Sequence, residues 1–151
     1  MEVKPDIARK IEKLVDWYRS EAADACPSQT QWTQILSLPE GKPVTLINFF
    51  KFREKAAYQS EQSATATGDE AFNRYASVSI PTMEKVGGKF LHVGPFAGTF
   101  LGENEDWDLV AIGSYPDLDA LYALYSDEDY RQAFHHRSAA VLRQKVVACS
   151  H

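Results

Sequence analysis

The stretch VTLINFFKF (44–52) decides the fold, because its residues predict a strand buried on both faces of a sheet. Most of its side chains are β-branched or aromatic, and glycine and proline punctuate the chain just before it. Its apolar run is far shorter than the ~20 residues that a membrane-spanning helix needs. Such a strand requires neighbours on both sides, and the later sequence supplies candidates.

Three later segments predict further strands. KFLHVGPFAGTFLG (89–102) alternates in polarity but contains Gly94 and Pro95. Because proline cannot donate to a central ladder, this segment predicts a bent edge strand. NEDWDLVAIGSYPD (104–117) is a turn followed by an apolar run, and RQKVVACS (143–150) predicts a short closing strand.

Two helices are predicted between these strands. The first covers 67–86, with a kink at Pro81, and the second covers 118–142, with a restart capped by Ser126. The order strand, helix, strand, strand, helix, strand (βαββαβ) places the chain in the α+β class. It predicts a ferredoxin-like domain, with a four-stranded antiparallel sheet and both helices on one face.

The segment REKAAYQSEQSATATG (53–68) connects the first strand to the first helix. It is polar, it lacks a period, and it is too long for a tight connection. We expect it to be mobile or to act as a flap over a site.

Residues 1–37 predict a helical arm that precedes the domain. Apolar residues at helical spacing over 5–25 indicate an amphipathic helix. It ends near Cys26, because Pro27 disfavours a helical conformation in the residue before it. The predicted division is therefore an arm at 1–37 and a ferredoxin-like domain at 38–151.

Composition excludes several classes of partner. The chain has 151 residues with 44% apolar content, enough for one core, and its net charge of −5 comes from interspersed acids and bases. Such a surface has no basic patch for nucleic acid or an anionic membrane. The N-terminus is charged rather than signal-like, so we expect a cytoplasmic protein. Cys26 and Cys149 lack metal-ligand spacing, which predicts free thiols and no metal site.

The stretch DEDYRQAFHHR (127–137) gathers two histidines and an arginine on the second helix. At about 100° per residue, Arg137 falls on the apolar stripe with Tyr130, whereas His135 and His136 fall on opposite flanks. The histidines therefore cannot hold one ligand together. A guanidinium turned toward the core is costly unless an anion or hydrogen-bond acceptors meet it.

Two interpretations of Arg137 remain open. It is either half of a structural ion pair with Asp108 or an acid of the neighbouring turn, or it is an anchor for an anionic ligand in a pocket between helix and sheet. His136 is likewise either a half-exposed helix residue or a general base, since imidazole titrates near neutral pH.

Several segments, in this order, resemble the DUF1330 family, whose function is unknown. They are LPEGKPVTLINFFKFR (38–53), Tyr58, EAFNRYASVSIPTMEKVGGKFLHVG (70–94), WDLVAIGSYPDLDALYALYSDEDYRQAFHHR (107–137) and RQKVVA (143–148). The resemblance covers roughly residues 38–149. It implies the dimeric α/β-barrel superfamily, in which the four-stranded sheets of a homodimer face one another with the helices outside. The element order is consistent with a homodimer, because a sheet covered by helices on one face leaves its other, apolar face in need of a partner.

The superfamily includes cofactor-free monooxygenases, lactone isomerases, haem-dependent enzymes and small-ligand-binding regulatory domains, so the fold alone does not choose an activity. Haem fits poorly, because His92 is the one histidine on a predicted strand that could face a pocket. The resemblance places these residues around one cleft: Asn48, Tyr75, Trp107, Asp108, His136 and Arg137.

We therefore expect an enzyme-like or ligand-binding homodimer that takes an apolar, weakly acidic organic molecule into a cleft between helix and sheet, with no cofactor. Arg137 would hold the anionic oxygen. Asn48, Trp107 and Tyr75 would contact the ligand. His136 and Asp108 would carry the proton transfer of a monooxygenase- or isomerase-like reaction. The alternative is a non-catalytic dimeric module, structural or regulatory.

Overall fold

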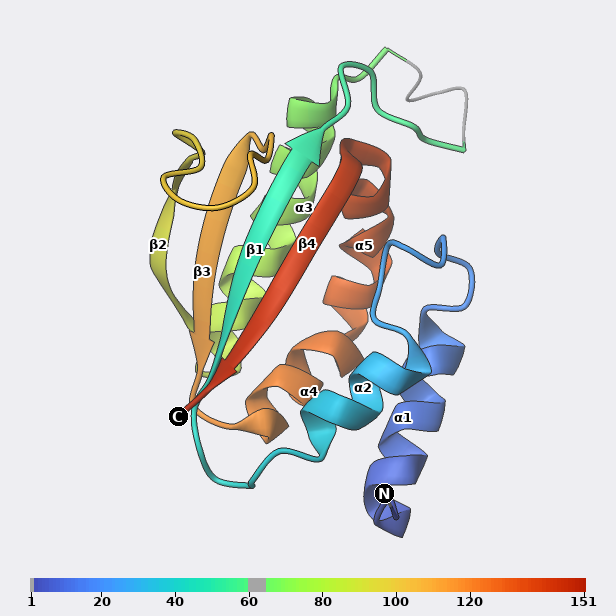
Figure 1. Ribbon diagram of the computed structural model, residues 1–151. Helices are drawn as coiled ribbons and strands as arrows, with labels where there is room; N and C mark the ends of the chain where they lie inside the picture. The colour runs from blue at the N-terminus through green and yellow to red at the C-terminus, as the bar shows by residue number, and fades with distance from the viewer. Residues whose placement is uncertain (1, 60–64) are drawn as a thin grey trace.

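A four-stranded sheet forms the centre of the computed structural model, which describes residues 2–59 and 65–151. Its strands are β1 (Val44–Phe52), β2 (Lys89–Pro95), β3 (Leu109–Tyr115) and β4 (Val141–Ser150). They lie in the order β2-β3-β1-β4, and every neighbouring pair is antiparallel (Figure 1). The stretch VTLINFFKF (44–52) is therefore the central strand β1.

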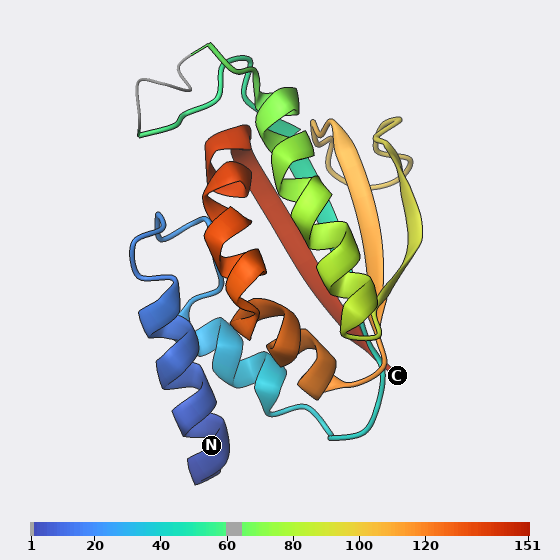
Figure 2. The same cartoon turned by 180° about the vertical axis from the view of Figure 1, so that it is seen from behind.

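One face of the sheet carries the domain's helices (Figure 2). They are α3 (Gly68–Lys85), α4 (Leu118–Ser126) and α5 (Glu128–Ala140). This arrangement confirms the α+β, ferredoxin-like prediction. The predicted cap at Ser126 is wrong, because Ser126 is the last residue of α4 and the Asp127 side chain accepts the Tyr130 amide at the start of α5.

The edge position of β2 agrees with its proline. Pro95 ends the strand, and the pairing with β3 shifts register between Phe90 and His92, so the strand is irregular as its sequence predicted. The helix α3 continues through Pro81 to Lys85.

The predicted flap is described in part. Its ends are joined, since the Ala56 amide donates to the Ala66 carbonyl at 2.9 Å and Lys55 forms a bridge with Thr67. Residues 60–64, the middle of this segment, lie outside the described residues.

The arm consists of α1 (Pro5–Trp17) and α2 (Gln29–Leu36). The first helix ends eight residues short of the predicted end at residue 25. The arm packs beside α4 and α5 (Figure 1), where the Tyr18 hydroxyl donates to the Tyr125 carbonyl at 2.7 Å. Buried arm residues belong to the same hydrophobic cluster as β1 and α4. The division at residue 37 stays a prediction.

The other face of the sheet, which we call the outer face, carries no helix (Figure 1). Side chains alternate along β1, so Leu46, Asn48 and Phe50 point to the helices while Ile47 and Phe49 point outward. Ile47 and Phe49 are half-buried in the single chain, and so are Leu46 and Asn48 on the helix face, so the predicted full burial on both faces is not observed. None of the described helices is long and apolar enough to cross a membrane.

Candidate functional site

A cleft of about 570 Å³ lies between α3 and the helix face of the sheet. Its walls are mainly apolar and aromatic side chains from β1, β2, β3 and α3, with a few polar groups among them. The polar residues are Asn48, Asp69, Asn73, Tyr75, Ser79, Tyr115, Tyr125, Tyr130 and Arg137.

Contacts at both ends of α3 keep the cleft open between them. At the first, a Cβ on Gly68 would lie 2.0 Å from the Arg53 carbonyl oxygen, so only glycine allows this approach. At the second, Met83 reaches the sheet so closely that a Cβ on Gly113 would lie 2.8 Å from its Cε. Between these contacts the small side chains of Ala76 and Ser79 leave the space unfilled.

Arg137 contributes a buried cation to the wall of this cleft. The residue is 6% exposed. Its Nε and Nη2 donate to Gln144 Oε1 at 3.1 and 2.9 Å, and its Nη1 donates to Tyr75 Oη at 3.1 Å. The guanidinium carbon also lies 4.9 Å from the centroid of the Phe50 ring. The inward orientation predicted from helical rotation is thus observed.

All the hydrogen-bond partners of Arg137 within residues 2–59 and 65–151 are neutral. The ion pairs of this part of the chain do not include it. Burial opposes the charge, but the oxygens of Tyr75, Tyr125 and Tyr130 outweigh that effect and hold the pKa of Arg137 above its ordinary value. The cleft wall therefore carries a permanent positive charge.

Tyr75 links Arg137 to a second hydroxyl. Its Oη lies 2.6 Å from Tyr130 Oη, and Tyr130 is 1% exposed. Burial raises the pKa of Tyr130 well above its ordinary value, so this phenol stays protonated. Across the cleft, Asn48 Nδ2 donates to the Ala111 carbonyl at 3.0 Å, and its amide oxygen remains an acceptor.

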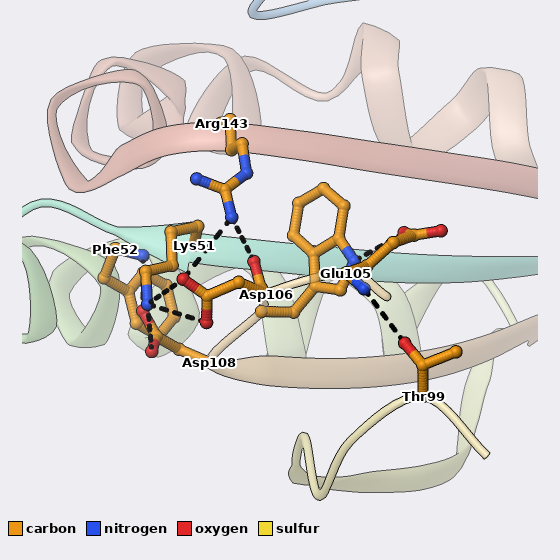
Figure 3. Close-up of polar contacts among 8 residues, drawn as sticks. Lys51, Phe52, Thr99, Glu105, Asp106, Asp108 and Arg143 are labelled. Carbon is orange, nitrogen blue, oxygen red and sulfur yellow. Dashed lines mark hydrogen bonds and ion pairs between the residues drawn. The ribbon is translucent and has the colours of Figure 1, made fainter. Parts of the chain in front are cut away.

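Trp107 and Asp108 do not line this cleft. Asp108 belongs to a polar network at one end of the sheet (Figure 3), and Trp107 joins it on the outer face, where its ring packs on Phe49. Asp108 accepts from Lys51 Nζ at 3.3 Å and from the Phe52 amide at 2.8 Å, and Trp107 Nε1 donates to Glu105 at 2.7 Å. The expected ion pair between Asp108 and Arg137 is therefore wrong, since Asp108 pairs with Lys51.

The polar network at this end of the sheet is balanced in charge. Lys51 lies between Asp106 and Asp108, whose hydrogen bonds raise the pKa of Lys51. Hydrogen bonds from Lys145 and Trp107 lower the pKa of Glu105. Each charge here has a partner, which describes a structural network rather than a binding site.

His136 also lies away from the cleft. Its Nδ1 is 2.6 Å from Tyr58 Oη, and Arg74 Nη1 donates to the same oxygen at 3.3 Å. Burial, His135 and Arg74 lower the pKa of His136, which favours its neutral imidazole. Of the residues expected around one cleft, the structure brings together Asn48, Tyr75 and Arg137. The roles assigned to all of them stay predictions.

Two residues of this arrangement were not predicted from the sequence. The sequence places Tyr130 on the apolar stripe of its helix without a partner, yet a buried phenol needs a hydrogen-bond partner, and that requirement points to a polar group such as Tyr75. Gln144 lies on the helix face of β4, and its partner on α5 depends on how strand and helix pack. No local pattern in the sequence signals it.

A family model for a domain of unknown function (DUF1330) matches residues 53–149. The chain belongs to the DUF1330 family. This DUF1330 chain is also similar to the crystal structure of a protein of unknown function from Rhodopseudomonas palustris. The two are 30% identical, with a TM-score of 0.75, and the match covers 85% of this chain and 96% of that one. The methylated form of that protein matches with 30% identity and a TM-score of 0.76, over 84% and 93%. No curated protein matches the chain.

Proposed function

We propose that this DUF1330 protein, as a homodimer, binds a small, apolar organic acid in the cleft beneath α3, with Arg137 holding the acid's carboxylate. The observation that carries the proposal is the buried guanidinium with neutral partners. Burying a cation without an anion is costly, and a bound carboxylate would offset that cost.

The donors of Arg137 suit a carboxylate. A guanidinium has five N–H groups. Those bound to Gln144 and Tyr75 leave one N–H on each terminal nitrogen without an acceptor in the described part of the chain. Two such donors match the two oxygens of one carboxylate, which is a strong, directional form of recognition.

The rest of the cleft suits an apolar body with one further polar group. Its volume of about 570 Å³ is within the usual range for small-molecule sites. Phe50, Phe72 and Phe90 supply aromatic surface. The free amide oxygen of Asn48 would accept a hydrogen bond from a hydroxyl of the ligand.

Proton transfer in the cleft would use groups that touch Arg137. Tyr75 would give its proton to the ligand and take one back from it as the reaction ends. Arg137 donates to the Tyr75 oxygen and the Tyr130 hydroxyl lies 2.6 Å from it, so both would stabilise the negative charge that this oxygen carries in between. This pair takes the place of His136 and Asp108 in the proposal, because those side chains lie outside the cleft.

The rival proposal is a non-catalytic dimeric module, and one observation favours it. Gln144 and the ring of Phe50 already give the guanidinium a planar, partly satisfied environment. In a pure module these contacts suffice, and added organic acids leave the protein's stability unchanged.

Thermal unfolding with two matched probes tests the proposal. We expect phenylacetate to raise the melting temperature and phenylacetamide, its neutral analogue, to do so far less. Arg137→Met should weaken phenylacetate binding roughly tenfold or more, since hydrogen bonds to charged groups are lost. Ala76→Trp, which fills the cleft without touching the cation, should also abolish binding and covers the case in which Arg137→Met fails to fold.

Equal stabilisation by the acid and the amide would remove the role of the carboxylate. Stabilisation by phenylacetate that survives in Ala76→Trp would show binding elsewhere on the protein. Either result overturns the proposed site, and the absence of any effect on the folded wild-type protein favours the module.

A further inference from the structure

We propose that a second pocket, between the arm and β4, binds a neutral apolar group, aromatic or branched alkyl, that carries a carbonyl oxygen. This arm pocket has a volume of about 580 Å³. Its walls come from residues 24–35 of the arm, from α4 and from β4, together with Leu46 and Arg137. The proposal is independent of what occupies the cleft beneath α3.

About half of the arm pocket is built outside the part of the chain that the family model matches. That match begins at residue 53, whereas half of the pocket's wall comes from the arm. The arm is held firmly enough to form a wall, because Tyr18 is anchored on Tyr125 and Ser138 donates to Glu21 at 2.6 Å.

Uncovered apolar surface points into the arm pocket. Val146 lies on the face of β4 that the helices cover, yet it is 42% exposed. Beside it, the Trp32 and Tyr125 rings meet edge to face with centroids 5.0 Å apart. Ile35 and Leu121 complete an apolar wall. A hydrophobic group placed here would lose contact with water on several sides.

Gln144 gives the arm pocket a weakly bonded donor. Its Oε1 is taken by Arg137, so the orientation of the carboxamide is set and Nε2 points away from the guanidinium. Nε2 reaches the Ala25 carbonyl only at 3.5 Å, the limit of a hydrogen bond. A ligand carbonyl would offer this N–H a better acceptor.

The charges of the arm pocket favour a neutral ligand. The Nε–Nη2 edge of Arg137 is occupied by Gln144. The remaining charged side chain of the wall is Asp24, since the Lys145 ammonium turns to the outer face and pairs with Glu105 at 2.7 Å. An acid gains less here than in the cleft, where the Tyr75 side of Arg137 is available.

Leu46, Tyr125 and Arg137 line both the arm pocket and the cleft beneath α3. They therefore form a partition between two compartments rather than the wall of a single one. A molecule in the arm pocket would contact Gln144, which holds Arg137 through two hydrogen bonds, so binding in one pocket would affect the other.

Two cysteines provide a test that needs no known ligand. Cys26 lines the arm pocket, whereas Cys149 is exposed. We would react the folded protein with N-phenylmaleimide and with N-ethylmaleimide and measure each rate at each cysteine by peptide mass spectrometry. Burial raises the pKa of Cys26 and slows both reagents alike, so the ratio of the two rates reports recognition of the phenyl group.

We expect the phenyl-to-ethyl rate ratio at Cys26 to exceed that at Cys149 by about fivefold or more, because the ring is buried before the bond forms. Val146→Trp, which fills the arm pocket, should reduce the ratio at Cys26 to the value at Cys149. Leu142→Trp, at another exposed position of β4 that lies outside the pocket, should leave the ratio unchanged.

Equal ratios at both cysteines overturn the proposal, and so does a raised ratio that Val146→Trp leaves intact. The experiment contains no carboxylic acid, so its result stands apart from that of the phenylacetate titration. Failure of one compartment is therefore distinguishable from failure of the other.

Discussion

Arg137 and His136 are neighbours in α5, yet they have opposite electrostatic surroundings. One step of about 100° along the helix separates them. It carries Arg137 to the sheet, among neutral acceptors and aromatic rings, and it carries His136 to Tyr58 and Arg74. The first site keeps its cation because the charge is permanent, and the second disfavours a proton because burial, His135 and Arg74 all lower the pKa of His136.

The titration of His136 should reflect these surroundings. Burial, His135 and Arg74 lower the pKa of His136. We expect its ring signals in NMR to titrate below the ordinary value near 6.5. His135→Gln should raise the midpoint, because it removes one of the repelling groups.

The same shift predicts how stability depends on pH. Since the fold favours the neutral imidazole, the unfolded chain takes up the proton first as the pH falls. The contribution of His136 to stability is present above about pH 6.5 and is lost as the pH falls through the lower folded-state pKa. A midpoint at or above the ordinary value would contradict the assignment.

At the scale of elements, the position of α3 depends on Gly68. A Cβ there would lie 2.0 Å from a backbone oxygen of Arg53, which cannot move without disturbing the end of β1. At Gly113 the closest atom, 2.8 Å away, is instead the tip of the flexible Met83 side chain. Gly68 therefore excludes any larger residue, whereas Gly113 accepts a methyl group if Met83 moves.

We expect Gly68→Ala to reduce the free energy of unfolding by about 2 kcal/mol or more, as strained substitutions do. Gly113→Ala should cost less than about 1 kcal/mol, because Met83 can repack. Urea unfolding of both variants measures the difference. Similar costs would mean that α3 is not held in place at Gly68.

Elements were more predictable than the site, for a physical reason. The four strands follow from local composition and periodicity, the edge position of β2 follows from its proline, and the inward face of Arg137 follows from helical rotation. Trp107 lies just before β3, in a segment without regular alternation, so its side cannot be derived from a period. The contact between Arg137 and Gln144 joins two elements, and sequence spacing alone does not encode it.

For the whole molecule, the apolar outer face of the sheet suggests an interface with a second chain. A row of aliphatic side chains crosses it, with Ile47 opposite Ile112 on β3 and Val147 on β4. No described helix covers this row (Figure 1). The ion pairs around Lys51 lie at one end of the same face, where they would orient a partner rather than bind it.

We propose that a second copy of the chain covers this face, as the resemblance to the α/β-barrel superfamily implies. Ile112→Glu places a charge in the middle of the row and should weaken the dimer roughly hundredfold or more, because an unpaired buried carboxylate is costly. Light scattering across a dilution series measures the dissociation. Val15→Glu, a substitution of an exposed aliphatic residue on α1, is the matched control and should leave the dimer intact.

The outcome also bears on the cleft, because the two lie on opposite faces of the sheet. A monomeric Ile112→Glu variant that still binds phenylacetate would show that each chain carries a complete site. Loss of binding together with the dimer would mean that the partner shapes the cleft through the sheet. A wild-type chain that is monomeric at every concentration would remove the dimer from the proposed function, and the aliphatic row would then need another cover.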